Sequence, residues 1–169
     1  DQEDNGTMEK YCYDNNPDNC AIYGGLYQWD EMMQYVTEEG VQGICPPGWH
    51  LPTDEEWKVL EGAVDSQYGI GDGVWENLYS RGYDAGTNLK AASGWYANGN
   101  GTDQFGFSGL PGGSRYTNMT GFDELGVHGY WWGSDAVRAW GRILDFSLTG
   151  VGRGWWAQEV AFSVRCVKD

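Results

Sequence analysis

The chain is poor in basic residues. Of its 169 residues only 10 are Lys or Arg, against 25 Asp or Glu, and the formal net charge is −15. Proteins that bind nucleic acid or anionic membranes neutralise phosphates with Lys and Arg. The composition therefore excludes nucleic acid and anionic membranes from the expected partners, and it is typical of a solvated acidic surface.

Long apolar runs are missing as well. No segment approaches the run of about 18 apolar residues that indicates a membrane-spanning helix, so direct membrane insertion is not expected. No signal peptide is recognisable at the start. We expect a mature or trimmed extracellular piece, secreted or displayed at a cell surface, with any anchor outside this segment.

Metal-binding motifs are scarce. The cysteines follow neither a CxxC nor a Cys/His spacing, and no EF-hand loop with alternating Asp and a final Glu is present. A structural calcium ion is the second explanation for the acidic charge, and its weak candidate ligands are Asp103, Gln104, Asp123 and Glu124. No other cofactor is expected.

Glycine and large aromatic residues are abundant. The chain has 27 Gly, 10 Trp and 11 Tyr, which predicts many turns and buried aromatic rings rather than long helices. The length fits one domain. Residues 1–10 are acidic and lack apolar periodicity, so we interpret them as a flexible lead-in to a domain that spans residues 11–169.

Four cysteines allow three disulfide connectivities. We favour Cys12–Cys20, which would close a local turn, and Cys45–Cys166, which would tie an early segment to the last strand. Two disulfides indicate an oxidising compartment.

Two helices are predicted in the first half of the chain. Apolar residues recur at helical spacing in Gln28–Val36. Thr53 and Glu56 form a capping-box pattern, followed by an apolar face of Trp57, Leu60 and Val64. Residues 69–100 are interpreted as loops and short strands. The strands predicted after Thr102 are Phe105–Leu110, Tyr130–Gly133, Arg142–Leu148 and Phe162–Lys168.

Near the end of the chain, a regular strand pattern carries chemically unrelated residues. The alternation in Arg142–Leu148 places Leu144, Phe146 and Leu148 on the inner side and the residues between them outside. Thr149-Gly150 is typical of a turn between strands. Unrelated side chains on a regular frame indicate a binding surface. Its candidate ligand-binding residues are Ile143, Asp145, Ser147, Gly150, Gly152, Gly154, Trp155, Trp156, Ala157 and Glu159.

Each of these residues also has a plainer interpretation. Neighbouring residues in a strand point to opposite faces, so at least one of Trp155 and Trp156 is expected to face out, while core packing is the alternative for either ring. Gly150, Gly152 and Gly154 are either turn glycines or positions that leave space for a ligand.

The segment Cys45–Trp57 reads Cys-Pro-Pro-Gly-Trp-His-Leu-Pro-Thr-Asp-Glu-Glu-Trp and resembles the Fibrobacter succinogenes major paralogous domain family. Further matching stretches follow in the family's order, from about residue 11 to the end. They are Tyr11–Ala21, Gly24–Trp29, Asn98–Gly113, Gly129–Trp132 and Phe162–Val167.

This resemblance implies a C-type-lectin-like fold, an α+β domain with two helices packed on a twisted antiparallel sheet, long Gly-rich loops and the same two disulfides. The chain is also similar to variable proteins of diversity-generating retroelements, in which a reverse transcriptase rewrites adenines near the 3′ end of the gene. The resemblance implies a variable region at residues 141–160. Residues 138–169 contain no Asn, although the rest of the chain is rich in it. Diversification leaves this trace, and so does ordinary divergence.

Three functional hypotheses follow. The first is an adhesin or receptor-binding domain with a diversified face that contacts a protein or glycan on another cell or surface. The second is an undiversified carbohydrate-binding or adhesive module. The third, an enzyme of the formylglycine-generating type, needs reactive cysteines that the two expected disulfides would consume, so an enzyme is not expected. The oligomeric state is not predicted.

Overall fold

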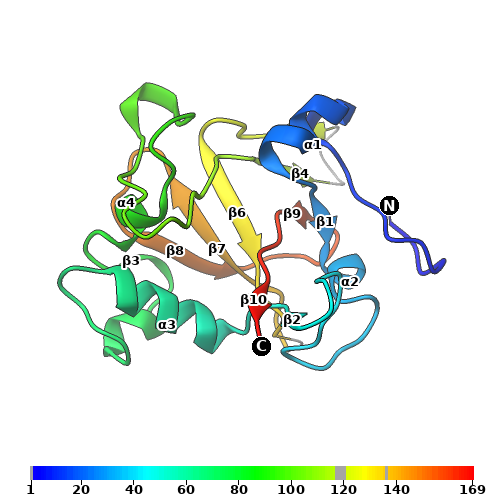
Figure 1. Ribbon diagram of the computed structural model, residues 1–169, viewed down its shortest axis with the longest axis horizontal. Helices are drawn as coiled ribbons and strands as arrows, with labels where there is room; N and C mark the ends of the chain where they lie inside the picture. Colours follow the sequence, from blue (N-terminus) through cyan, green and yellow to red (C-terminus); the bar gives the residue numbers. More distant parts are fainter. Residues whose placement is uncertain (1, 117–120, 136) are drawn as a thin grey trace.

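The computed structural model describes residues 2–116, 121–135 and 137–169 (Figure 1). These residues form an α+β structure of short helices and antiparallel strands, as expected from the sequence. Instead of two helices, the described residues contain four α-helices: α1 (Pro17–Tyr23), α2 (Trp29–Met32), α3 (Asp54–Val64) and α4 (Ala85–Leu89). Sequence reasoning missed α1 and α4, because both lie among turn-forming residues without a repeated apolar period.

The strands form three antiparallel sheets rather than the single sheet expected from the sequence. One four-stranded sheet has the order β3 (Tyr79–Arg81), β8 (Val151–Trp155), β7 (Trp140–Asp145) and β6 (His128–Trp132). A second sheet has the order β1 (Tyr27–Gln28), β9 (Ala161–Phe162), β4 (Ser114–Tyr116) and β5 (Gly121–Asp123). The third pairs β10 (Val167–Lys168) with β2 (Trp49–His50).

The capping box predicts the start of α3 correctly. The Thr53 hydroxyl accepts a hydrogen bond from the Glu56 amide at 3.1 Å, and the Glu56 carboxylate accepts one from the Thr53 amide at 2.9 Å. Trp57 and Val64 on the predicted apolar face are buried. Figure 1 shows α3 below β7 and β8, on which this face packs.

The helix predicted over Gln28–Val36 is shorter than expected. It ends at Met32 because Gln34 and Tyr35 adopt positive φ angles of 52° and 60°, which cannot continue a right-handed helix. Met32 is fully buried, whereas Val36 is 45% exposed. The apolar spacing therefore predicted the buried turn and overestimated its length.

The strand predictions have mixed outcomes. Tyr130–Gly133 and Arg142–Leu148 are confirmed in position by β6 and β7, but β7 ends at Asp145, so Leu148 is exposed instead of facing inward. Phe162–Lys168 is divided into β9 and β10, which belong to different sheets. Phe105–Leu110 is not a strand, since Gly106 and Ser108 have φ angles of 70° and 51°.

Both predicted disulfides are confirmed. Cys12 is bonded to Cys20 and Cys45 to Cys166. Cys45 is buried in one of two hydrophobic clusters. The two clusters lie on opposite faces of the β6–β7–β8 region, since Trp132 belongs to the first and its neighbour Trp131 to the second.

The predicted lead-in makes contact with the domain. Gln2 and Gln28 exchange two hydrogen bonds of 2.7 Å between the main chain of one and the side chain of the other. Asp1 lies outside the described residues. Within the described ranges, no helix is long and apolar enough to cross a membrane.

Candidate binding cleft

The β7–β8 hairpin has two chemically distinct faces. Antiparallel pairing sets Ile143 opposite Gly152 and Gly141 opposite Gly154. Alternation then separates an outer face, defined as Ile143, Asp145, Gly152 and Gly154, from an inner face, defined as Arg142, Leu144, Val151 and Arg153. The four inner-face residues are all buried, whereas the four outer-face residues are only partly buried.

The outer face forms the floor of a cleft of about 460 Å³. Such a volume falls within the usual range of small-ligand sites. Seven of the ten candidate residues line it: Ile143, Asp145, Gly150, Gly152, Gly154, Trp155 and Trp156. Ser147 adjoins the cleft, because its amide and hydroxyl both donate hydrogen bonds to Asp145 at 2.6 Å.

The structure separates the last two candidates from this cleft. Ala157 and Glu159 are exposed between β8 and β9 and do not line it. Glu159 instead borders a small cavity of about 160 Å³ beside Asp30 and Glu31, and its carbonyl accepts a hydrogen bond from Gln28 at 2.8 Å. The continuous segment 141–160 therefore contributes to two separate surfaces.

One wall of the cleft was not foreseen from the sequence. Tyr79 and Ser80 come from β3, about seventy residues before β8, and pair with Arg153 and Gly152. Tyr79 is 80% exposed and has a φ angle of 63°. No short-range pattern links these strands, so only an alignment of covarying positions could have signalled the wall. The lining residues that sequence reasoning missed are Leu78, Tyr79, Ser80, His128, Leu148 and Arg153.

The two adjacent tryptophans have different environments. Trp155 is 48% exposed, and its ring makes an edge contact with Trp140 at a centroid distance of 5.4 Å. The guanidinium carbon of Arg138 lies 4.8 Å from the centre of the Trp155 ring. Trp156 is half-buried and packs edge-on against Phe162 at 5.3 Å. Trp155 is thus the more exposed ring, and Trp156 joins the cleft to the core.

The three candidate glycines are not equivalent. A Cβ at Gly150 would lie 2.5 Å from the backbone oxygen of Arg81, which leaves no room for a side chain. At Gly152 the closest atom would be the Ile143 Cβ at 3.1 Å, and at Gly154 the Trp156 ring at 3.0 Å. Gly150 is therefore required by close backbone packing, whereas the other two leave space in the cleft.

One end of the cleft is polar and acidic. His128 Nε2 lies 2.7 Å from Asp145, and its Nδ1 lies 3.2 Å from Glu124, which also accepts a hydrogen bond from the Tyr130 hydroxyl. Burial raises the pKa of Asp145, but the hydrogen bonds from Ser147 and His128 outweigh burial and lower that pKa below its ordinary value. Asp145 is therefore ionised at neutral pH.

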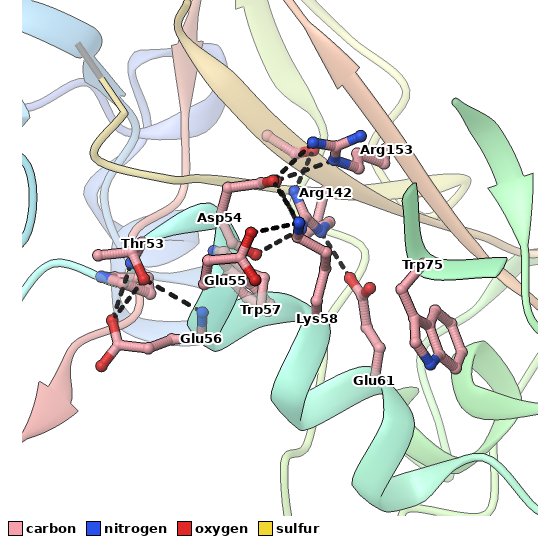
Figure 2. Close-up of polar contacts among 12 residues, drawn as sticks. Thr53, Asp54, Glu55, Glu56, Trp57, Lys58, Glu61, Trp75, Arg142 and Arg153 are labelled. Atoms are coloured by element: carbon pink, nitrogen blue, oxygen red, sulfur yellow. Dashed lines mark hydrogen bonds and ion pairs between the residues drawn. The ribbon is translucent and has the colours of Figure 1, made fainter. Parts of the chain in front are cut away.

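The inner face is held by buried ion pairs. Figure 2 shows the contacts of Asp54 on α3 with Arg142 and Arg153. Arg153 forms a bidentate pair with Asp54 at 2.9 and 2.6 Å, and Arg142 reaches the same carboxylate at 2.9 Å. Arg142 and Arg81 also share the fully buried Glu61. Three arginines of the sheet are thereby bound to the first two turns of α3.

The buried ion pairs shift the pKa values of the groups that form them. Burial alone would raise the pKa of Asp54, but Arg153 and Arg142 outweigh burial and lower the pKa to about 2. Burial lowers the pKa of Arg81 to about 10, against the opposing effect of Glu61. Removing one partner of a buried pair leaves an uncompensated charge, which costs about 3–5 kcal/mol. The outer face thus rests on a strongly constrained layer.

The acidic residues considered for calcium have protein partners. Asp103 accepts hydrogen bonds from the amide and hydroxyl of Ser108, both at 2.6 Å. Among the described residues, His, Cys, Asp and Glu form no group of three or more that could hold a metal ion.

Comparisons with known proteins establish the family. No curated protein and no solved structure matches the chain. The model of the Fibrobacter succinogenes major domain family matches residues 2–168, which is nearly the whole chain. The chain therefore belongs to the Fibrobacter succinogenes major domain family.

Proposed function

We propose that this protein is an extracellular ligand-binding domain of C-type-lectin-like fold, acting as an adhesin or receptor-binding module. Its ligand face is the cleft over β7 and β8, and residues 141–160 are a retroelement-diversified segment. The ligand is a protein or glycan on another cell or surface. The two disulfides agree with an oxidising, extracellular environment.

One observation carries the proposal. Seven residues chosen from the sequence as variable binding positions line one cleft. The residues that alternate with them, Arg142 and Arg153 above all, are buried and paired with α3. A ligand face can be rewritten without unfolding only if its frame and its contact positions are separate. The alternation of the outer and inner faces separates most of them, whereas Gly150 both lines the cleft and belongs to the packed frame.

Two features support diversification and a binding role. Residues 138–169 contain no Asn, as expected after adenine-directed rewriting of template codons. All four cysteines are in disulfides, which supports binding over the thiol chemistry of a formylglycine-generating enzyme.

Sequencing the DNA that flanks the gene tests diversification. We expect a near-identical copy of the segment encoding residues 138–166, differing from the gene only where the copy has adenines, close to a reverse-transcriptase gene. If the flanking DNA holds neither a copy nor a reverse transcriptase, diversification is wrong and the cleft belongs to an undiversified module.

The exposure of Trp155 favours that second candidate, a carbohydrate-binding module, because exposed aromatic rings stack on sugars. A glycan array separates the candidates. If the protein binds a glycan, Trp155→Ala should abolish binding, while Tyr96→Ala, a 63% exposed ring that does not line the cleft, should leave it unchanged. Equal loss in both variants would contradict a role for Trp155.

A further inference from the structure

The cleft combines a bare backbone floor with apolar walls. Gly152 and Gly154 expose their main chain, while Ile143, Leu148 and Tyr79 supply apolar side-chain surface around it. Burying apolar area yields roughly 25 cal/mol per Å², so such a site favours an apolar group. Aromatic side chains are the largest apolar groups in proteins and bury about 150–250 Å² each. Ile143 already covers the Cβ position of Gly152, and the Trp156 ring covers that of Gly154. An incoming ring would therefore pack against Ile143, Leu148 and Tyr79 beside these glycines.

The two tryptophan rings of the cleft offer poor platforms for a sugar. Trp156 is packed against Phe162 and Tyr130, with centroid distances of 5.3 and 6.2 Å. Trp155 has Arg138 over its ring and Trp140 at its edge. A sugar also needs several convergent polar groups, whereas the polar groups here gather at one end. This geometry favours a protein side chain over a glycan as the occupant.

The charge at the polar end of the cleft indicates which type of residue stands next to the aromatic residue of the partner. Asp145 and Glu124 flank His128, and Lys90 lies nearby, where it donates to the carbonyls of Asp145 and Leu148 at 2.8 and 2.9 Å. Arg153 is paired with Asp54, so the two carboxylates outnumber the one remaining cation and this end is negative while the imidazole is neutral. The net charge of −15 adds attraction for a basic partner.

We propose that the cleft binds a protein partner through an aromatic side chain placed next to Lys or Arg, with the ring beside Gly152, against Ile143, Leu148 and Tyr79, and the cation at Asp145. This inference rests on the proposed function, because it assigns a ligand class to the same face. The size of the residue at 152 then limits the size of the ring that the cleft accepts.

Model dipeptides test this ligand class on the intact protein. The probes are N-acetyl-Trp-Arg-amide, N-acetyl-Trp-Glu-amide, N-acetyl-Ala-Arg-amide and methyl-β-galactoside. Binding is followed through the amide NMR signals of Gly150, Gly152 and Gly154 in ¹⁵N-labelled protein. We expect weak, saturable shifts with Trp-Arg, at least about fivefold weaker binding of Trp-Glu, and no shift with Ala-Arg, because unit charges about 4 Å apart contribute about 1 kcal/mol in water.

Variants separate the two parts of the interaction. Gly152→Val should abolish Trp-Arg binding by filling the floor, and Gly69→Val, where no atom lies within 4 Å of the added Cβ, is its control. Asp145→Asn should keep Trp binding and remove the preference for Arg over Glu. If the NMR spectrum of Gly152→Val is no longer dispersed, the variant is unfolded and Tyr79→Ala is used instead. The Tyr79 side chain is 80% exposed, so its removal does not open the core. Weaker Trp-Arg binding is expected for Tyr79→Ala.

The outcomes distinguish the two levels of the proposal. Shifts of the same glycine signals by the galactoside alone would overturn the aromatic-cation ligand and keep the cleft as the ligand face. Binding of Trp-Arg and Trp-Glu with equal affinity would overturn the cationic part. If no probe shifts these signals at millimolar concentration, the inference is wrong, while diversification is judged separately by the flanking DNA.

Discussion

The inner and outer faces of the β7–β8 hairpin share one backbone and differ in almost every physical respect. On the inner face, Arg142 is 1% exposed and bound to two carboxylates of α3. On the outer face, its neighbour Ile143 borders an open cleft and faces a glycine across the strand pair. Adjacent codons therefore encode residues under opposite constraints, as the proposed variation of a binding face on a fixed frame requires.

The largest effect should appear when methionine is placed first on the inner face and then on the outer face of the hairpin. Arg142→Met removes charge-assisted bonds to Asp54 and Glu61, which keep Arg153 and Arg81 as partners. The two lost bonds should cost about 3–5 kcal/mol of unfolding free energy. Ile143→Met conserves volume at a half-buried position and should cost less than about 1.5 kcal/mol. Urea denaturation of both variants measures the difference. Equal costs would remove the distinction between the faces.

A smaller effect is expected for the glycines. Gly150→Ala forces a Cβ to 2.5 Å from the Arg81 carbonyl oxygen and should destabilise the fold by about 3 kcal/mol. Gly152→Ala meets the Ile143 side chain at 3.1 Å, and the lost flexibility of the unfolded chain offsets that crowding, so we expect a change within about 1 kcal/mol. Thermal unfolding of both proteins checks this order. A more severe effect at Gly152 would show that the cleft floor is structural.

Acid should weaken the inner face. The pKa of Asp54 is lowered to about 2 in the folded state, against about 3.9 in an unfolded chain. Its stabilisation is therefore complete above pH 3.9 and disappears as the pH falls toward 2, a loss on the order of 2 kcal/mol. Urea denaturation from pH 6 to pH 2 measures it. Asp54→Asn should reduce this acid dependence, whereas Asp145→Asn should retain most of it. The reverse result would assign the acid sensitivity to the cleft.

The smallest effect concerns the outer face alone. Ser147→Ala removes the hydroxyl hydrogen bond to Asp145, so the pKa of Asp145 should rise toward its ordinary value. The unfolding free energy should change by no more than about 0.5 kcal/mol, because Ser147 is exposed. An NMR titration of the Asp145 carboxyl follows the pKa. No change in that pKa would mean that the Ser147 amide and His128 control the charge at this end.

Local patterns predicted what local contacts determine. The capping box of α3 involves only Thr53 and Glu56, three residues apart, and it is present as expected. The alternation in Arg142–Leu148 correctly placed Ile143 and Asp145 on a common face. It failed at Leu148, because an alternating pattern does not show where a strand ends.

Long-range contacts account for what sequence reasoning missed. Arg142 and Arg153 are charged residues in positions that composition alone would assign to the surface. They are buried because Asp54 and Glu61, roughly eighty to a hundred residues earlier, supply matching carboxylates. Likewise, Tyr79 and Ser80 reach the cleft only because β3 pairs with β8.

By itself the sequence determined the start of α3 and the alternation along Arg142–Leu148, because both depend on residue type and short-range periodicity. The α+β class and the pairing of Cys45 with Cys166, 121 residues apart, follow from the resemblance to the family rather than from a local pattern. Only the tertiary structure decided that this face is a cleft, with β3 as its wall, His128 at its acidic end and Glu159 outside it. Those features arise where distant segments meet, and the ion pairs of Arg142 and Arg153 with Asp54 join two of these segments.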